Sequence, residues 1–360
     1  MWNRHVDKAL SDFGLNRLTA DFCVYAIYTG ADRILLGLFV DDMFIIGRSM
    51  LKIGGVKAFL HSRFRMKDLG AATFLLGMEI RRLPGGALQL LQEKYLGEVL
   101  LRFPVDNSRA ASTPLPPGSK LSAADSPQSQ EEVDRMALIP YRSAIGSLMY
   151  LAVCTRPDIA AAVSSLSRFN ANPGKAHWEG VQHVLRYLQS TSGKGLVYKK
   201  GESTQLWGYC DASFLTCPDT GRCRGAYVFL SAGGAISWQS KLIPNASLSS
   251  CESEYLQFSA ATTEASFLRQ LQEQMVGKKA TTPVNICVDS KPALDILHNP
   301  VYHARTKQIL ARYHFIRDRM NVEKEVTFEK ITSGQMGADM LTKHAAVGVV
   351  RYNKKLIGLE

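Results

Sequence analysis

Cysteine is scarce in this sequence, and no cysteines are paired in a metal-binding motif. The chain has 360 residues and seven cysteines, an odd number without any C-x-x-C pair, so neither a disulfide framework nor a zinc knuckle is indicated. We therefore expect a reducing, intracellular compartment. The sequence also lacks a run of about 18 apolar residues, so no membrane-spanning helix is expected. The first ten residues, MWNRHVDKAL, lack the apolar region of a signal peptide.

Acidic residues are the scarcer charged class. The sequence has 32 Asp and Glu against 43 Lys and Arg, a formal net charge of +11. With 46% hydrophobic and 21% charged residues, the composition is typical of a globular protein. A basic balance favours a polyanionic partner, and nucleic acid is the usual one. A basic surface without a partner has the same charge, so charge alone leaves both possibilities open.

One segment is poor in large apolar residues. Residues 112–134, STPLPPGSKLSAADSPQSQEEVD, are rich in Pro, Ser and charge, and we interpret them as an exposed linker. Before the linker, residues 1–111 combine strand patterns such as ILLGLFV, MFIIG and FLLGMEIRR with amphipathic helix patterns, which predicts a mixed α/β unit. After it, residues 135–195 are helical by pattern, with a break at Pro157.

A third region begins at residue 196. Three short strand patterns are followed by a long helical pattern over residues 250–276 and by two further strands that alternate with helices, the last of them in QMGADMLTK. The order βββαβαβα predicts an α/β domain with a mixed sheet over residues 196–345. Residues 346–360 are interpreted as a tail.

Acidic residues recur at the edges of these elements. Asp211 and Asp289 each end an apolar strand, so in neighbouring parallel strands both carboxylates would emerge at one end of the sheet. Glu254 lies in the first turns of the long helix, on the stripe that faces the sheet, and Asp339 begins the last helix. Converging carboxylates repel one another, and Mg²⁺, which prefers oxygen ligands, would relieve this repulsion. Taken singly, each acid also fits an unrelated position at a helix start or turn.

The segments around these acids resemble a known family. The stretches GAISWQSKLIPNASLSSCESEYLQFSAATTEASFLRQL, VDSKPALDILHNPVYHARTK and ADMLTK are similar to the RNase H domain of copia-type retrotransposon Pol polyproteins. This resemblance implies the ribonuclease H fold and two bound Mg²⁺ ions, with Mn²⁺ as the other candidate. Two stretches, CDAS and TKQIL, depart from the family's usual residues without removing a ligand. The metal-binding, catalytic acids implied by the resemblance are Asp211, Glu254, Asp289 and Asp339.

Basic residues follow the third acid in a helical pattern, and in a nuclease this face would follow a phosphate backbone. A solvated helix face explains the same pattern equally well. The residues concerned are His303, Arg305, Lys307, Arg312 and Arg317.

The stretch FVDDMFIIG at residues 39–47 is similar to the reverse transcriptase signature of the same family, a hairpin with Asp41 and Asp42 at its turn. Residues 1–111 would then be part of a polymerase palm, and residues 135–195 a thumb or connection. Polymerase chemistry needs a further Asp from an upstream palm strand, and only 40 residues precede Asp41. We therefore expect an N-terminally truncated chain without polymerase activity of its own.

The resemblance implies an RNase H that hydrolyses the RNA strand of RNA–DNA hybrids. Its partners would be the hybrid, template RNA and DNA, and the remainder of the Pol polyprotein. The main alternative is a non-catalytic nucleic-acid-binding remnant of a decayed or co-opted element. An integrase-type enzyme is less favoured, because that family ends its acid series with Glu and here the Glu comes second. Elements of this family work in cytoplasmic virus-like particles before nuclear entry, so both locations are implied.

Overall fold

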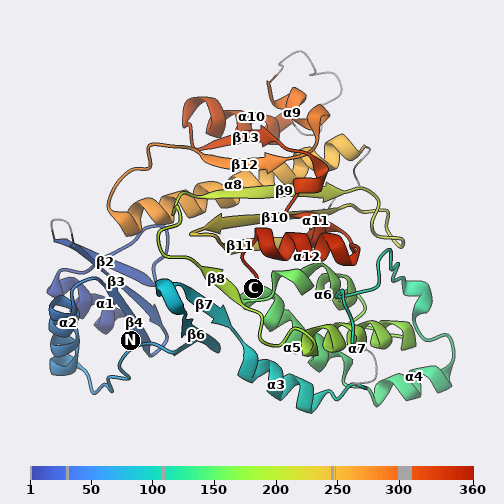
Figure 1. The fold of residues 1–360 in the computed structure, drawn as a ribbon, viewed down its shortest axis with the longest axis horizontal. Helices are drawn as coiled ribbons and strands as arrows, with labels where there is room; N and C mark the ends of the chain where they lie inside the picture. The colour runs from blue at the N-terminus through green and yellow to red at the C-terminus, as the bar shows by residue number, and fades with distance from the viewer. Residues whose placement is uncertain (1, 30–31, 107–109, 245–246, 248, 299–309) are drawn as a thin grey trace. The chain divides into compact units, whose positions relative to one another are not determined.

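The computed structural model describes residues 2–29, 32–106, 110–244, 247, 249–298 and 310–360. The chain divides into two compact units. The first consists of Met1–Ala72 with Glu264–Pro283, and the second of Thr73–Thr263 with Val284–Glu360. Helix α8 (Ser250–Val276) therefore contributes residues to both units. Figure 1 shows the elements of each unit. The domain boundaries expected from the sequence stay a prediction.

The first unit contains a four-stranded antiparallel sheet in the order β1-β2-β3-β4. Its core is formed where the apolar stripe of α1 and that of α2 meet the sheet, and it includes Val6, Leu10 and Leu36, all fully buried. The predicted hairpin and the N-terminal amphipathic helix are both confirmed. The elements are α1 (Trp2–Phe13), β1 (Asn16–Arg17), β2 (Val24–Thr29), β3 (Asp32–Phe39), β4 (Asp42–Gly47) and α2 (Met50–Arg63).

The C-terminal part of α8 completes this unit. The side-chain oxygen of Gln274 accepts hydrogen bonds from the backbone amides of Thr19 (2.9 Å) and Ala20 (3.0 Å). Leu271 and Met275 pack against a second small apolar cluster of the sheet. This end of α8 is therefore held by the first unit through both polar and apolar contacts.

The second unit begins with a small antiparallel sheet in the order β5-β6-β7-β8. The single strand predicted across FLLGMEIRR is wrong, because Leu76 and Gly77 have φ angles of 49° and 74° and form a turn between β5 and β6. A Cβ on Gly77 would lie 2.1 Å from the Tyr150 hydroxyl, so this turn requires glycine. The stretch PGG at residues 84–86 forms the turn of the hairpin between β6 and β7. The strands are β5 (Phe74–Leu75), β6 (Met78–Arg82), β7 (Leu88–Leu91) and β8 (Leu196–Tyr198).

A helical layer lies between β7 and β8 in the sequence. Its apolar residues form one continuous core, with Leu148, Leu166 and Leu185 all fully buried. The connection from α5 to α6 contains a buried ion pair between Arg156 and Asp158 at 2.8 Å. The helices are α3 (Glu93–Arg102), α4 (Gln130–Ala137), α5 (Tyr141–Cys154), α6 (Ala160–Ser167) and α7 (Lys175–Gln189).

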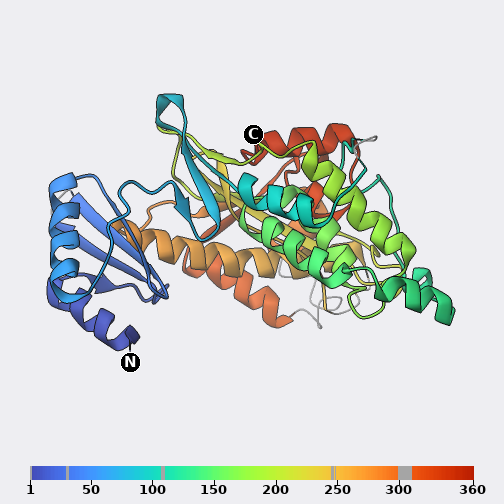
Figure 2. The ribbon, with the colours of Figure 1, turned by 90° about the horizontal axis from the view of Figure 1, so that it is seen from below.

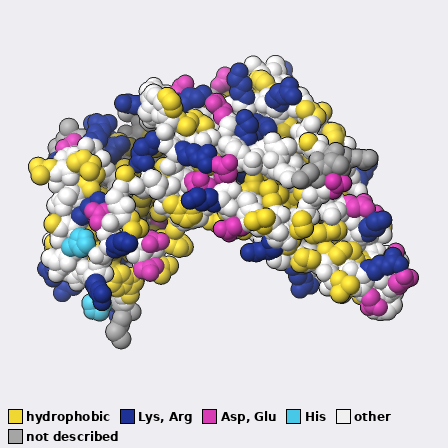
Figure 3. All heavy atoms as spheres, turned by 60° about the horizontal axis from the view of Figure 1, so that its bottom comes forward, with side chains coloured by type: hydrophobic (Ala, Val, Ile, Leu, Met, Phe, Trp, Pro, Cys, Tyr) yellow, Lys and Arg dark blue, Asp and Glu magenta, His cyan; other side chains and the backbone are white. Residues whose placement is uncertain are grey.

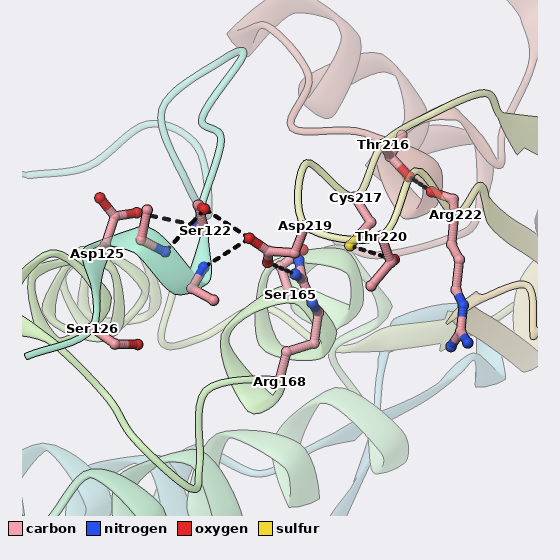
Figure 4. Close-up of polar contacts among 12 residues, drawn as sticks. Ser122, Asp125, Ser126, Ser165, Arg168, Thr216, Cys217, Asp219, Thr220 and Arg222 are labelled. Carbon is pink, nitrogen blue, oxygen red and sulfur yellow. Dashed lines mark hydrogen bonds and ion pairs between the residues drawn. The ribbon is translucent and has the colours of Figure 1, made fainter.

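The segment 112–134 is tied to the rest of the second unit. Figure 4 shows Asp219 between Ser122 and Arg168. The Asp219 carboxylate accepts hydrogen bonds from the Ser122 hydroxyl (2.7 Å) and the Ala123 amide (2.9 Å), and it forms an ion pair with Arg168. Residues 113–115 are buried. This part of the segment is packed, although its composition predicted an exposed connection.

A five-stranded mixed sheet forms the other layer of the second unit, in the order β11-β10-β9-β12-β13. Strand β10 is antiparallel to β9 and β11, whereas β12 is parallel to β9 and β13. The strands are β9 (Trp207–Ser213), β10 (Arg224–Ser231), β11 (Gly234–Leu242), β12 (Val284–Val288) and β13 (Val326–Lys330). Together with the helices, they confirm the predicted order βββαβαβα.

Helices cover this sheet on both faces. Helix α8 runs along one face (Figure 2), where Phe258 contacts Phe328 of β13 with ring centroids 5.1 Å apart. On the other face, Met340 and Leu341 of α11 pack into the core. The sequence pattern missed α12, which follows the helix expected to be the last, and Ile357 and Leu359 beyond it are buried. The remaining helices are α9 (Lys291–His298), α10 (Leu310–Arg317), α11 (Asp339–Thr342) and α12 (Val347–Leu356).

Two surface features bear on the expected partners. In the described part of the chain no single helix is long and apolar enough to span a membrane, and α4 and α5 meet the length and composition test only as a pair bent by 53°. On the face drawn in Figure 3, Lys and Arg side chains are spread among acidic and apolar ones. On this face, the net positive charge of the chain is not gathered into one patch.

Candidate metal centre

Two of the acids come from adjacent parallel strands. The register pairs Cys287 of β12 with Tyr209 of β9. Two residues further along each strand direction lie Asp289 and Asp211, so both carboxylates reach the same end of the sheet. The parallel pairing of β9 and β12 meets the condition under which the sequence placed both carboxylates at one end of the sheet.

The third acid comes from the start of α8. The Ser249 hydroxyl accepts a hydrogen bond from the Glu252 amide at 3.1 Å, which caps the first turn of the helix. Downstream, Phe258 and Ala261 are fully buried on the stripe that faces the sheet. Glu254 lies on the same stripe, with only 8% of its surface exposed. The helix therefore directs this carboxylate toward the end of the sheet where the two Asp residues emerge.

The three acids converge. Ligand oxygens of Asp211, Glu254 and Asp289 all lie within 4.8 Å of one another. Burial, together with the charges of Asp211 and Asp289, raises the pKa of Glu254 to about 9. Burial also raises the pKa of Asp211 to about 6. Without a cation, the site thus opposes the ionisation of its own carboxylates.

The donor set fits a divalent metal ion. The Oε2 atom of Glu254 is buried and has no hydrogen-bond partner, although such an atom is costly unless it is satisfied. A cation among the three carboxylates would satisfy it. Three carboxylates offer the hard oxygen ligands that Mg²⁺ or Mn²⁺ prefer. Among the described residues, this is the one group of three or more His, Cys, Asp or Glu side chains with ligand atoms close enough to hold an ion.

The fourth predicted acid, Asp339, lies outside that group. Its carboxylate forms an ion pair with Lys343 at 2.8 Å. It is nevertheless near enough for its charge to raise the pKa of Asp211 and of Glu254. The structure therefore brings three of the four acids together and places the fourth beside them with its own cation.

Sequence reasoning missed two residues of this site, Thr342 and Lys343. The Thr342 hydroxyl donates a hydrogen bond to Asp211. Burial lowers the pKa of Lys343, but the hydrogen bond and charge of Asp339 and the charges of the two other Asp residues outweigh this, so the pKa of Lys343 lies above its ordinary value. Both residues belong to the quoted stretch ADMLTK, but nothing in their spacing indicates a contact with a strand more than a hundred residues away.

The remaining predicted residues lie elsewhere. Asp41, in the β3–β4 turn, and Asp42, the first residue of β4, are exposed in the first unit. Arg312 is exposed on α10, whereas the guanidinium of Arg317 lies 5.1 Å from the ring centre of Tyr313 and hydrogen-bonds to its hydroxyl. The other three basic residues lie outside the described residues: His303, Arg305 and Lys307.

Comparisons with known proteins point to one family. Residues 1–117 match the family described as Reverse transcriptase (RNA-dependent DNA polymerase). The chain is 41% identical over 360 residues to the Retrovirus-related Pol polyprotein from transposon TNT 1-94 of Nicotiana tabacum, which accounts for 99% of this chain and 27% of that polyprotein. It is 31% identical over 265 residues to a transposon Ty5-1 protein of Saccharomyces cerevisiae, which accounts for 73% of this chain and 84% of that protein.

Among solved structures, the chain is similar to LC11-RNase H1 in complex with an RNA/DNA hybrid. This similarity has 15% sequence identity and a TM-score of 0.29, and it covers 37% of this chain and 88% of the other.

Proposed function

Because this chain belongs to the family of copia-type retrotransposon Pol polyproteins, we propose that its five-stranded sheet carries an RNase H activity. The reaction is hydrolysis of the RNA strand of an RNA–DNA hybrid. The observation that supports it most directly is the group of Asp211, Glu254 and Asp289 at one end of the sheet, where the first two are buried, the third is half-buried, and one carboxylate oxygen of Glu254 is unsatisfied.

Each acid has a role that follows from its position. Asp211 and Asp289 would hold Mg²⁺ from the strand ends and Glu254 would hold it from α8, and Asp339 would serve as a fourth ligand if two ions bind. When bound, Mg²⁺ supplies the Lewis-acid chemistry of phosphodiester hydrolysis. The hydrogen bond from Thr342 orients Asp211 and favours its charged form. The protein thus presents its carboxylates from rigid elements on two sides.

The chemistry belongs to this site rather than to the hairpin of the first unit. Asp41 and Asp42 resemble two ligands of a polymerase site, but among the described residues they belong to no group of three candidate ligands. We therefore propose no polymerisation by this chain alone. As partners we propose RNA–DNA hybrids, template RNA and DNA, and the rest of a Pol polyprotein, in cytoplasmic particles and in the nucleus.

The proposal is tested with the full chain and a hybrid labelled on its RNA strand. We expect cleavage with Mg²⁺ or Mn²⁺ and none with EDTA. Asp289→Asn should abolish cleavage, because a neutral amide replaces a charged ligand. Asp295→Asn is the matched control, since this acid is exposed on α9, and it should cleave at the wild-type rate.

Two results would contradict the proposal. Cleavage by Asp289→Asn at the wild-type rate would remove that residue from the site. Hybrid binding without cleavage by the wild-type chain would favour a non-catalytic nucleic-acid-binding remnant. A gel-shift assay on the same hybrid separates loss of binding from loss of cleavage.

A further inference from the structure

The acid that stays outside the metal-binding group has a cation of its own. Helix α11 starts at Asp339, and Lys343 follows directly after its last residue. The Lys343 ammonium lies 2.8 Å from Oδ1 of Asp339. The backbone amide of Lys343 donates to the Asp339 carbonyl at 3.2 Å, which fixes the two residues one turn apart. Backbone and side chain together hold this pair.

We propose that Lys343 acts as a built-in cation that occupies Asp339 in the metal-free protein and competes with the divalent ion for this carboxylate. Lys343 would then be a positioning residue that acts through Asp339. The inference rests on the proposed function only in taking the acids as a metal site. It assigns a role to a side chain that is not a ligand.

The contacts of the two residues make competition physically reasonable. The ammonium on Oδ1 of Asp339 and a metal ion on the same carboxylate would draw on the same negative charge, so each weakens the binding of the other. The Asp339 side chain is only 13% exposed, which limits its alternatives, whereas the Lys343 side chain is 50% exposed and can turn into solvent. An ammonium and a divalent cation beside the same carboxylates also repel each other. Metal binding therefore works against the ion pair.

The ion pair also reduces the repulsion among the acids when no metal ion is bound. Charges of Asp339 and Asp289 act on the buried Asp211, so the acids oppose one another when no metal is bound. The ammonium of Lys343 neutralises the acid that lies outside the group of three. Removing it should leave the metal-free site less stable and more receptive to a cation.

A second lysine provides the control for charge alone. The Lys330 ammonium hydrogen-bonds to the backbone carbonyl oxygens of Asp289 and Ile331. It therefore contacts the segment that carries a metal-binding acid without forming an ion pair with a carboxylate in the described part of the chain. Comparing Lys330→Met with Lys343→Met separates the general loss of a positive charge from the loss of the Asp339 contact.

The experiment measures Mn²⁺ binding to the full chain by electron paramagnetic resonance, without nucleic acid. We expect Lys343→Met to bind Mn²⁺ about fivefold more tightly, the scale of a half-exposed ion pair. Lys343→Arg keeps the charge and should bind as the wild type does, and Lys330→Met should change the affinity by less than about twofold. In EDTA, Lys343→Met should also unfold at a lower temperature than the wild type, and saturating Mn²⁺ should remove this difference.

Unchanged or weaker Mn²⁺ binding by Lys343→Met overturns the inference, as does an equal gain in Lys330→Met. If Lys343→Met does not fold, Lys343→Gln is measured under the same criteria. The proposed RNase H activity fails on a different result, the absence of cleavage by a wild-type chain that binds Mn²⁺. The two ideas can therefore fail separately.

Discussion

The Thr342 hydroxyl donates a hydrogen bond of 2.6 Å to Oδ2 of Asp211, and both side chains are buried. The bond joins α11 to the central strand β9 across the end of the sheet. It opposes the effect of burial on Asp211, because it stabilises the charged carboxylate. Thr342 is not one of the proposed metal ligands, but its hydroxyl orients the Asp211 carboxylate and favours its charged form.

Thr342→Val keeps the shape of the side chain and removes this bond. We expect the free energy of unfolding to fall by about 1.5–3 kcal/mol, the value of a hydrogen bond to a charged group. The pKa of Asp211 should rise further, so the acidic limb of the pH profile of hybrid cleavage should move to higher pH. Urea unfolding and a pH series of cleavage rates measure both effects.

Thr342→Ser is the matched control, because it keeps the hydroxyl. It should retain the wild-type pH profile even if the lost methyl group lowers stability. An unchanged acidic limb in Thr342→Val would show that the hydroxyl does not influence Asp211.

The buried ion pair of the helical layer should be costly to break. Arg156 and Asp158 are 3% and 1% exposed, and the Tyr187 hydroxyl donates a second bond to Asp158 at 2.6 Å. Arg156→Met leaves the carboxylate buried without its cation. We expect a loss of about 3–5 kcal/mol in the free energy of unfolding, measured by urea denaturation.

An exposed ion pair provides the comparison. Arg135 and Glu131 lie one turn apart on α4, with side chains 71% and 74% exposed. Arg135→Met should cost less than about 0.5 kcal/mol. If Arg156→Met and Arg135→Met lowered the free energy of unfolding by the same amount, burial would not be the reason that the Arg156–Asp158 pair is costly to break.

His344 should make stability depend on pH. Burial, with a smaller effect of the Arg224 charge, lowers the pKa of His344 from 6.5 to about 4. Between these values the unfolded chain binds a proton that the folded chain does not, so stability is complete above pH 6.5 and falls as the pH drops toward 4. The loss from this group is at most about 3 kcal/mol.

His344→Gln tests this expectation by urea unfolding at pH 7 and pH 5. The pKa values of His177 and His183 are also lowered, by burial, and these residues contribute in both proteins. The wild type should therefore lose more stability than the variant between the two pH values. The same loss in both would exclude His344 as a source of the pH dependence.

Local pattern was sufficient for most individual elements. The strands on either side of Asp41 and Asp42, the stripe of α8 that carries Glu254 and the strand that precedes Asp289 all follow from periodicity, because they depend on residues only a few positions apart. The turn at Leu76 and Gly77 was missed because the apolar residues on both sides of it have the pattern of one continuous strand. Helix α12 was missed because its burial depends on the sheet that it covers.

The sequence by itself determined which acids end strands and begin helices, and its quoted stretches pointed to the family. Only the tertiary structure decided that Asp211, Glu254 and Asp289 meet while Asp339 pairs with Lys343. It alone placed Thr342 on Asp211, 131 positions away in the chain. The physical reason is that strand order and helix packing decide which distant side chains meet, and spacing along the chain carries no record of that contact.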